Sequence, residues 1–215
     1  MSDIIRFDEV SVTVQDKTLL TQVSFTLRAG EKAVLCGKSG SGKSTILKTL
    51  LGMYSLAAGK IYFDSQPLTS KSVQSVRRCT AYIGQEPILG ADTVRNALLL
   101  PFQFKSHRHL QPSDHQLKQV LQRLQLPTEL LSRDCAGISG GEKQRLTLAR
   151  GLLLDKTVYL LDEVTSALDQ ESKQAVFEVF ADPQLTVLAV AHDTEWLERS
   201  QPVFEMHAGR LTQTR

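Results

Sequence analysis

The fold is decided by the stretch Gly37-Lys38-Ser39-Gly40-Ser41-Gly42-Lys43-Ser44-Thr45. It fits the phosphate-binding loop pattern G-x-x-x-x-G-K-[ST] at every specified position. The apolar run 33–36 before it predicts a buried strand, and the apolar spacing over 45–51 predicts a helix after it. A Gly- and Ser-rich turn can match the pattern by chance, but a chance match would not require a strand before it and a helix after it. The sequence therefore predicts a loop that binds phosphate groups.

The residue types in this loop match the chemistry of a polyphosphate. Glycines let successive backbone N–H groups converge on one anion, and the following helix points its positive end at the same place. The Lys43 ammonium can reach the β- and γ-phosphates, and the Ser44 hydroxyl can bind Mg²⁺. We therefore expect a polyphosphate held together with Mg²⁺.

The composition is that of an ordinary globular domain. The chain has 215 residues, of which 41% are hydrophobic and 22% are charged. A net charge of +2 without a basic block predicts no nucleic-acid partner. The cysteines Cys36, Cys79 and Cys135 lie far apart, without metal-ligand spacing, so we expect reduced packing residues in a cytosolic protein.

No stretch of the sequence has the pattern of a signal segment or of a membrane-spanning helix. Met1 is followed directly by Ser2 and Asp3, and the apolar runs are shorter than the roughly 18 residues that a transmembrane helix needs. Work at a membrane would therefore require another polypeptide to hold the chain there.

The order of the apolar patterns predicts an α/β fold. Strand patterns occupy the opening section, and helical patterns dominate from 87 to 155, where Ser113 and Gln116 form a capping-box start. Strands return at 157–161 and 186–191, with a helix between them. Such alternation predicts a mostly parallel sheet with helices on both faces. We expect an antiparallel N-terminal section, a nucleotide-binding core and an inserted helical section.

Two acidic residues end the strand predicted at 157–161. In a phosphate-loop protein, the strand-end acid Asp162 is placed to hold Mg²⁺ through water. Glu163 follows it and can orient or deprotonate an attacking water molecule. An acid pair after a strand is often a helix cap, but Lys43 and Ser44 already demand a metal partner. The pair is therefore predicted to be catalytic.

A second helix start carries the segment Ile138-Ser139-Gly140-Gly141-Glu142. Ser139 and Glu142 have capping-box spacing, which is a structural explanation for both. The capping box does not explain the two consecutive glycines. A helix N-terminus with a small hydroxyl side chain can also bind phosphate, so this segment is a second candidate phosphate-binding site. Because one subunit cannot easily use both devices on one nucleotide, we expect a site shared between two subunits.

Together these motifs resemble the ATP-binding subunit of an ATP-binding cassette (ABC) transporter, over essentially the whole chain. The matching segments, in that family's order, are the phosphate loop 37–45, Gln85, the signature 138–142, the acid pair 162–163, Asp169 and His192. The resemblance implies a P-loop NTPase fold in a single domain, 1–215. Its catalytic core would be 1–86 and 156–215, with an N-terminal antiparallel β subdomain, and its helical signature subdomain would be 87–155. The short length and the stretch 85–96 look most like bacterial subunits assigned to iron or metal export.

The resemblance also implies roles for matching residues. Gln85 would contact Mg²⁺ or the attacking water and report the nucleotide state to a membrane subunit. Ser139, Gly140 and Gly141 would cap the γ-phosphate of ATP bound by the opposite subunit of a head-to-tail dimer. Asp169 would reach across that dimer, and His192 would link Glu163 to the γ-phosphate.

The implied partners are a second cassette, expected to be identical, and an integral membrane permease that holds the chain at the inner face of the cell membrane. The family docks a short permease helix just after Gln85. The apolar residues there are Ile88, Leu89, Leu98, Leu99, Leu100, Phe102 and Phe104. Most of them could simply pack the helical section, but part of the set should be exposed if it forms a cleft.

The sequence departs from the family at the base site. The family stacks adenine on an aromatic side chain of its first strands, which falls at or near Val14 here, and no Tyr, Trp or Phe lies between residues 8 and 24. Adenine stacking is therefore not expected.

Two other functions compete with transport. ABC proteins that act on DNA carry long heptad insertions, and those that act on ribosomes carry tandem cassettes; this chain has neither feature. A small-molecule kinase would leave Ser139 and His192 unexplained, and ATP hydrolysis without an added acceptor would exclude it.

Overall fold

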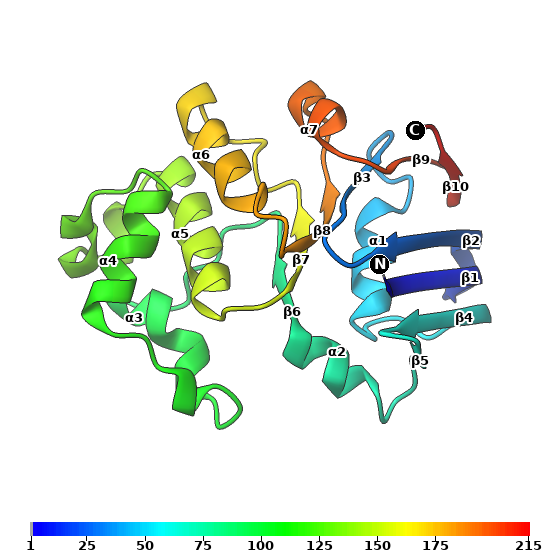
Figure 1. Ribbon diagram of the computed structural model, residues 1–215, viewed down its shortest axis with the longest axis horizontal. Coiled ribbons are helices and arrows are strands. Elements are labelled where there is room, and N and C mark those ends of the chain that lie inside the picture. The colour runs from blue at the N-terminus through cyan, green and yellow to red at the C-terminus, as the bar shows by residue number, and fades with distance from the viewer. Residues whose placement is uncertain (1) are drawn as a thin grey trace. The chain divides into compact units, whose positions relative to one another are not determined.

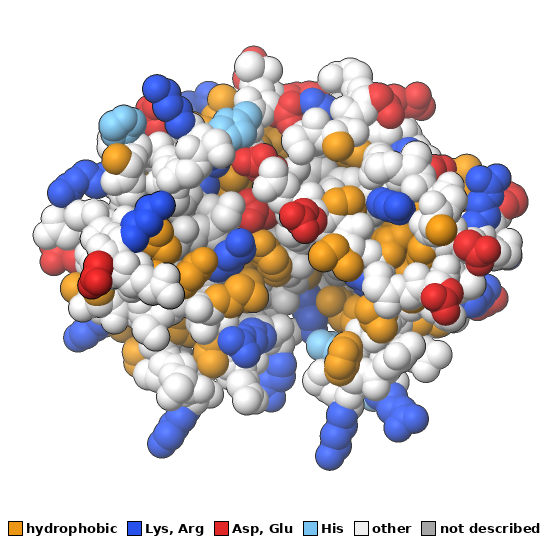
Figure 2. Space-filling model, turned by 180° about the vertical axis from the view of Figure 1, so that it is seen from behind, with side chains coloured by type: hydrophobic (Ala, Val, Ile, Leu, Met, Phe, Trp, Pro, Cys, Tyr) orange, Lys and Arg blue, Asp and Glu red, His pale blue; other side chains and the backbone are white. Residues whose placement is uncertain are grey.

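The computed structural model describes residues 2–215, which form two compact units (Figure 1). The first unit contains the residues up to Thr80 together with 157–163 and 183–215, and the second contains 81–156 and 164–182. No helix in the described range is long and apolar enough to cross a bilayer. Figure 2 shows acidic and basic side chains interspersed over much of one face, in keeping with the net charge of +2.

An antiparallel sheet opens the first unit, as predicted. Its strand order is β2-β1-β4-β5. The strands are β1 (Asp3–Val14), β2 (Lys17–Arg28), β4 (Ala58–Phe63) and β5 (Gln66–Pro67). The apolar alternation along β1 is imperfect because the pairing register shifts between Phe7 and Val10, where Glu9 takes a positive φ of 49°. The bulge turns the following side chains back toward the buried face.

A second sheet in this unit carries the nucleotide loop. Its strands follow the order β10-β9-β3-β8-β7. They are β3 (Lys32–Cys36), β7 (Val158–Asp162), β8 (Thr186–Val190), β9 (Val203–His207) and β10 (Arg210–Gln213). All pairs are parallel except β9 with β10. Every residue of β7 and β8 is buried, which is the pattern of a parallel strand covered on both faces.

Helices and aromatic side chains complete the first unit. Its helices are α1 (Lys43–Leu50), α2 (Val73–Cys79) and α7 (Thr194–Arg199). Helix α1 contacts β7 and β8, and α7 contacts β3. Phe25 stacks on Phe7 with ring centroids 4.7 Å apart and lies 5.2 Å from Phe204 of β9, so this aromatic cluster joins the two sheets.

The second unit is mainly helical. Its helices are α3 (Val94–Leu99), α4 (Asp114–Arg123), α5 (Gly140–Leu153) and α6 (Gln170–Phe180), with short 3₁₀ turns between α3 and α5. Strand β6 (Thr80–Ile83) lies at the boundary between the units. The unit contains the predicted helical subdomain 87–155 and adds 81–86, 156 and 164–182. The added segment lies against α5, since the atoms nearest to a Cβ built on Gly141 belong to Ala167 and Leu168.

Candidate functional site

The phosphate loop joins β3 to α1 and depends on glycine at several positions. Gly37, Gly40 and Gly42 have φ values of 126°, 76° and 109°, in the region that other residues rarely enter. A Cβ at Gly37 would collide with the carbonyl oxygen of Met206, and one at Gly42 would lie 2.9 Å from that of Leu19. The backbone conformation of this loop therefore requires glycine at these positions.

Lys43 is the first residue of α1 and is 4% exposed. Its Nζ donates hydrogen bonds to the carbonyl oxygens of Gly37, at 2.7 Å, and Lys38, at 3.1 Å. The ammonium is thus held against the start of the loop. The Ser41 hydroxyl is buried and has no hydrogen-bond partner within residues 2–215. A buried donor without a partner fits a loop that is built to receive an anion.

The predicted metal ligands Ser44 and Asp162 meet at the ends of α1 and β7. The Ser44 hydroxyl donates to Asp162 Oδ1 at 2.7 Å, and the Asp162 side chain is buried. These two hard oxygen groups suit Mg²⁺, which is usually bound by few protein ligands and completed by water and substrate phosphates. The described residues contain no cluster of three His, Cys, Asp or Glu side chains that could hold a metal alone.

The carboxylate of Glu163 lies beside the imidazole of His192. Glu163 Oε1 is 3.5 Å from His192 Nε2, and the two side chains are 21% and 50% exposed. Glu163 has a positive φ of 53°, and its N–H donates to the carbonyl oxygen of Val190 at the end of β8. Because His192 lies two residues after the end of β8, the carboxyl ends of β7 and β8 bring this pair together.

The hairpin of β9 and β10 supports the loop, which the sequence reasoning missed. The Gly209 N–H donates to the carbonyl oxygen of Ser41 at 2.9 Å, and Met206 lies against Gly37. Cys36, just before the loop, has its pKa raised by burial and by nearby Glu205. No local pattern in the last 15 residues signals this contact, because it depends on which strand lies beside β3.

The signature segment lies in the second unit, at the start of α5. The Ser139 hydroxyl accepts from the Glu142 N–H, and the Glu142 carboxylate accepts from the Ser139 N–H and hydroxyl, so the predicted capping box is confirmed. These hydrogen bonds lower the pKa of Glu142. A Cβ on Gly140 would meet no atom within 4 Å. The packing of the chain itself therefore does not explain why glycine stands there.

Asp169 caps the start of α6 in the same unit. Its carboxylate accepts from the N–H of Ser172 at 2.8 Å and from the Ser172 hydroxyl at 3.0 Å. These bonds lower the pKa of Asp169 and keep the exposed side chain ionised and oriented. Capping of helix α6 is therefore sufficient to explain why an aspartate stands at position 169.

The region after Gln85 is partly exposed, as expected. Ile88 and Phe104 are 67% and 64% exposed, whereas Leu89 is buried. Arg150 of α5 donates to the carbonyl oxygens of Ile88 and Leu89, both at 2.8 Å, and fixes this turn. A hollow of about 210 Å³ adjoins it, lined by Tyr82, Gly84, Glu86, Pro101, Arg150 and neighbouring residues. Gln85 itself is exposed.

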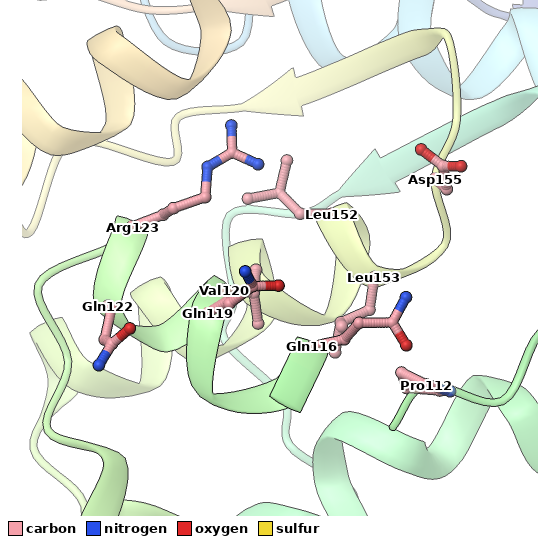
Figure 3. Close-up of a pocket in the computed structure, with 9 residues that line it drawn as sticks. All are labelled: Pro112, Gln116, Gln119, Val120, Gln122, Arg123, Leu152, Leu153 and Asp155. Carbon is pink, nitrogen blue, oxygen red and sulfur yellow. The ribbon is translucent and has the colours of Figure 1, made fainter. Parts of the chain in front are cut away.

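A larger hollow of about 610 Å³ lies between α4 and the end of α5. Figure 3 shows its lining residues, which are Pro112, Gln116, Gln119, Val120, Gln122, Arg123, Leu152, Leu153 and Asp155. It contains none of the residues predicted to bind nucleotide or metal. Size alone therefore does not mark the site of chemistry here.

The predicted site residues fall into two groups. Lys43, Ser44, Asp162, Glu163 and His192 belong to the first unit, where the contacts above bring them together. Gln85, the signature and Asp169 belong to the second unit. The end of β1 carries Val14 with its side chain 38% exposed, so an aliphatic group stands where the family would place an aromatic ring.

Comparisons with known proteins agree with this geometry. A family model described as ABC transporter matches residues 20–166. A probable iron export ATP-binding protein, FetA of Escherichia coli (strain K12), is 34% identical over 220 residues, covering 100% of this chain and 96% of that protein. The mitochondrial iron-sulfur clusters transporter ATM1 of Debaryomyces hansenii is 32% identical, covering 96% of this chain but 31% of its own length.

A solved bacterial Atm1-family ABC exporter with ATP bound has a TM-score of 0.86 at 25% identity, and the match covers 98% of this chain and 38% of the exporter. The chain thus spans about a third of the full exporters and nearly all of FetA. These relatives lend no support to a role on DNA or ribosomes. The matches and the geometry of the loop show that the chain belongs to the ABC transporter family, as a domain that binds and hydrolyses ATP.

Proposed function

We propose that the chain is the ATP-hydrolysing subunit of a membrane transporter, and that it works as a pair of copies bound to a separate permease. The observation that carries the proposal is the hydrogen bond between Ser44 and Asp162, beside a Lys43 held by the loop and a Glu163 held next to His192. Oxygen groups suited to Mg²⁺, a cation suited to phosphate and a carboxylate suited to act as a base thus support the proposal from within one unit.

The loop would bind the phosphates of ATP. Its backbone N–H groups and the positive end of α1 favour negative charge, and Lys43 would place its ammonium on the β- and γ-phosphates. Ser44 and Asp162 would hold Mg²⁺. When bound, Mg²⁺ neutralises charge on the β- and γ-phosphate oxygens and thereby eases the bond cleavage.

Glu163 would take the proton from the attacking water, or orient that water for attack. Its distance to His192 Nε2, 3.5 Å, lets the imidazole orient the carboxylate, and His192 would also contact the γ-phosphate. Most of the acceleration in such a reaction comes from positioning and from stabilising charge rather than from proton transfer alone. Lys43 and His192 would provide that stabilisation.

The signature would bind the γ-phosphate held by a second copy. Gly140 is compatible with this, because its built Cβ would have open space around it that a partner copy could fill. Ser139, Gly140 and Gly141 would approach the phosphate with the start of α5. Asp169 would contact the partner cassette. A homodimer is the simplest arrangement, since each copy carries both the phosphate loop and the signature segment.

The permease would dock on the surface after Gln85, where Ile88 and Phe104 are exposed beside the hollow that Pro101 and Tyr82 line. This would place the chain on the cytoplasmic side of the cell membrane. The transported substrate would be iron or another metal ion, moved outward. That proposal rests on the similarity to an iron export ATP-binding protein over nearly the full length of both chains.

The proposal is tested by Glu163→Gln, which keeps the shape of the side chain and removes the base. The variant should bind Mg-ATP, lose on the order of a hundredfold or more in ATPase rate, and accumulate as an ATP-bound dimer in light scattering. Glu198→Gln, at an exposed position of α7, is the control and should hydrolyse ATP normally. Full turnover by Glu163→Gln would contradict the assignment.

A further inference from the structure

The chain contains two capping boxes that differ in the residue that closes them. At α4, the Gln116 amide oxygen accepts from the Ser113 N–H at 2.9 Å and from the Ser113 hydroxyl at 3.0 Å. At α5, the Glu142 carboxylate accepts from the Ser139 N–H at 2.9 Å and from the Ser139 hydroxyl at 2.6 Å. An amide therefore suffices to cap a helix in this chain, and the carboxylate adds a shorter, charge-assisted bond.

The bonds at α5 engage both donors that Ser139 possesses. A serine hydroxyl has a single proton, and here that proton points to Glu142, while the Ser139 N–H is donated to the same oxygen. At neutral pH the oxygens of a phosphate are hydrogen-bond acceptors. A γ-phosphate at this position would therefore need the same two donors, the N–H and the hydroxyl of Ser139. A γ-phosphate can bind the Ser139 hydroxyl only after its bond to Glu142 is broken.

The carboxylate is also a negative charge at the place where that phosphate would arrive. Its pKa is lowered by the Ser139 hydrogen bonds and, more weakly, by Arg145 and Arg133, so it is ionised at neutral pH. Arg145 lies one turn further along α5 but donates to the carbonyl oxygens of Leu124 and Gln125. The positive charges of Arg145 and Arg133 therefore offset the charge of Glu142 only in part, and the remainder repels an incoming anion.

We propose that Glu142 is an internal competitor of the γ-phosphate at Ser139, and that it weakens the ATP-dependent pairing of two copies. The inference rests on the proposed function, in which Ser139 receives the phosphate of the partner copy. Glu142 is a positioning residue, because it acts through Ser139. It sets how readily the pair forms and reopens, while the affinity of a single subunit for ATP depends on the loop at 37–45.

The parent in this experiment is the Glu163→Gln variant, because its slow hydrolysis leaves the ATP-bound dimer intact. The parent is compared with a double variant that also carries Glu142→Gln. Sedimentation at a series of protein concentrations gives the Kd of the Mg-ATP dimer, and titration with a fluorescent ADP analogue gives the affinity of the single subunit. Glu142→Gln should lower the dimer Kd by about tenfold for each of the two Ser139 sites in the dimer, hence on the order of a hundredfold, and leave ADP affinity unchanged. Glu142→Met, which lacks both the charge and the acceptor, should also tighten the dimer.

Gln116→Glu is the matched control, because it places a carboxylate in the other capping box and should leave the dimer Kd unchanged. A dimer Kd that stays the same or rises in both Glu142 variants overturns the proposal. A purely structural cap would change the melting temperature without tightening the dimer. If the parent forms no dimer with Mg-ATP, the proposed function fails first, so the two failures are distinguishable.

Discussion

At the residue scale, Glu163 shows how the backbone places a reactive group. Its positive φ of 53° is uncommon for a residue with a side chain. The Glu163 N–H is bonded to the carbonyl oxygen of Val190, so the end of β7 stays attached to β8 while the carboxylate turns toward His192. Such backbone conformations are kept where the surrounding structure enforces them, and they are frequent at functional sites.

The base site yields a prediction at the same scale. Val14 offers no aromatic face, and stacking of a base on an aromatic side chain contributes about 1–3 kcal/mol. Recognition should therefore be dominated by the triphosphate, and GTP should compete measurably with ATP in a binding assay. Val14→Tyr should strengthen ATP binding, whereas Thr13→Tyr, one residue earlier on β1, should not. A preference of the parent for ATP of a hundredfold or more would show that another residue reads adenine.

At the element scale, helix starts were the most predictable feature. Both capping boxes follow from a serine three residues before Glu or Gln, and both occur in the structure. Helix α1 begins at Lys43, two residues before the predicted stretch, because Gly42 in the left-handed conformation starts the helix without a side-chain cap. Apolar spacing cannot show such a start, since Lys43 and Ser44 are polar.

The cap of α4 gives an expected stability change. Ser113→Ala removes the hydroxyl that accepts from the Gln116 N–H, and it should lower the free energy of unfolding by about 1 kcal/mol. Urea unfolding followed by circular dichroism would measure this. Ser70→Ala, at an exposed loop position, is the control and should change little. An unchanged urea midpoint for Ser113→Ala would show that the hydrogen bond contributes nothing net.

At the scale of the whole molecule, the ATPase motifs are divided between two units, with Lys43 in one and Ser139 in the other. The exposed apolar residues after Gln85 belong to the second unit, which also carries the signature. A permease docked there would contact the same compact unit that would meet the partner copy in the proposed dimer. This arrangement suits a subunit that converts nucleotide-dependent pairing into movement of a membrane protein.

The docking surface gives the third prediction. Ile88→Asp and Phe104→Asp place a charge on exposed apolar sites and should abolish co-purification of the permease while leaving ATP binding intact. Leu89 is unsuitable for this test because it is 6% exposed, so a charge there would disrupt packing. Met53→Asp, at another exposed apolar site in the first unit, is the control. Unchanged association of both variants would exclude these positions from the interface.

The sequence by itself determined the phosphate loop, the family and the alternation of strands and helices, and it predicted the metal-binding, acidic and signature residues. Each of these rests on residue types at short spacing, such as the glycines that only a tight loop requires and the acid pair at the end of an apolar strand. Local spacing carries that information because hydrogen bonds within a turn or a helix start involve residues only a few positions apart.

Only the tertiary structure decided which distant residues meet. It places Met206 and Gly209 against the loop, buries Leu89 while exposing Ile88, and gives the distances within the expected pairs Ser44–Asp162 and Glu163–His192. It also groups 164–182 with the helices of the second unit. The physical reason is that strand order and packing are long-range: a strand beside β3 can come from any part of the chain, and its neighbours in sequence do not indicate which one it is.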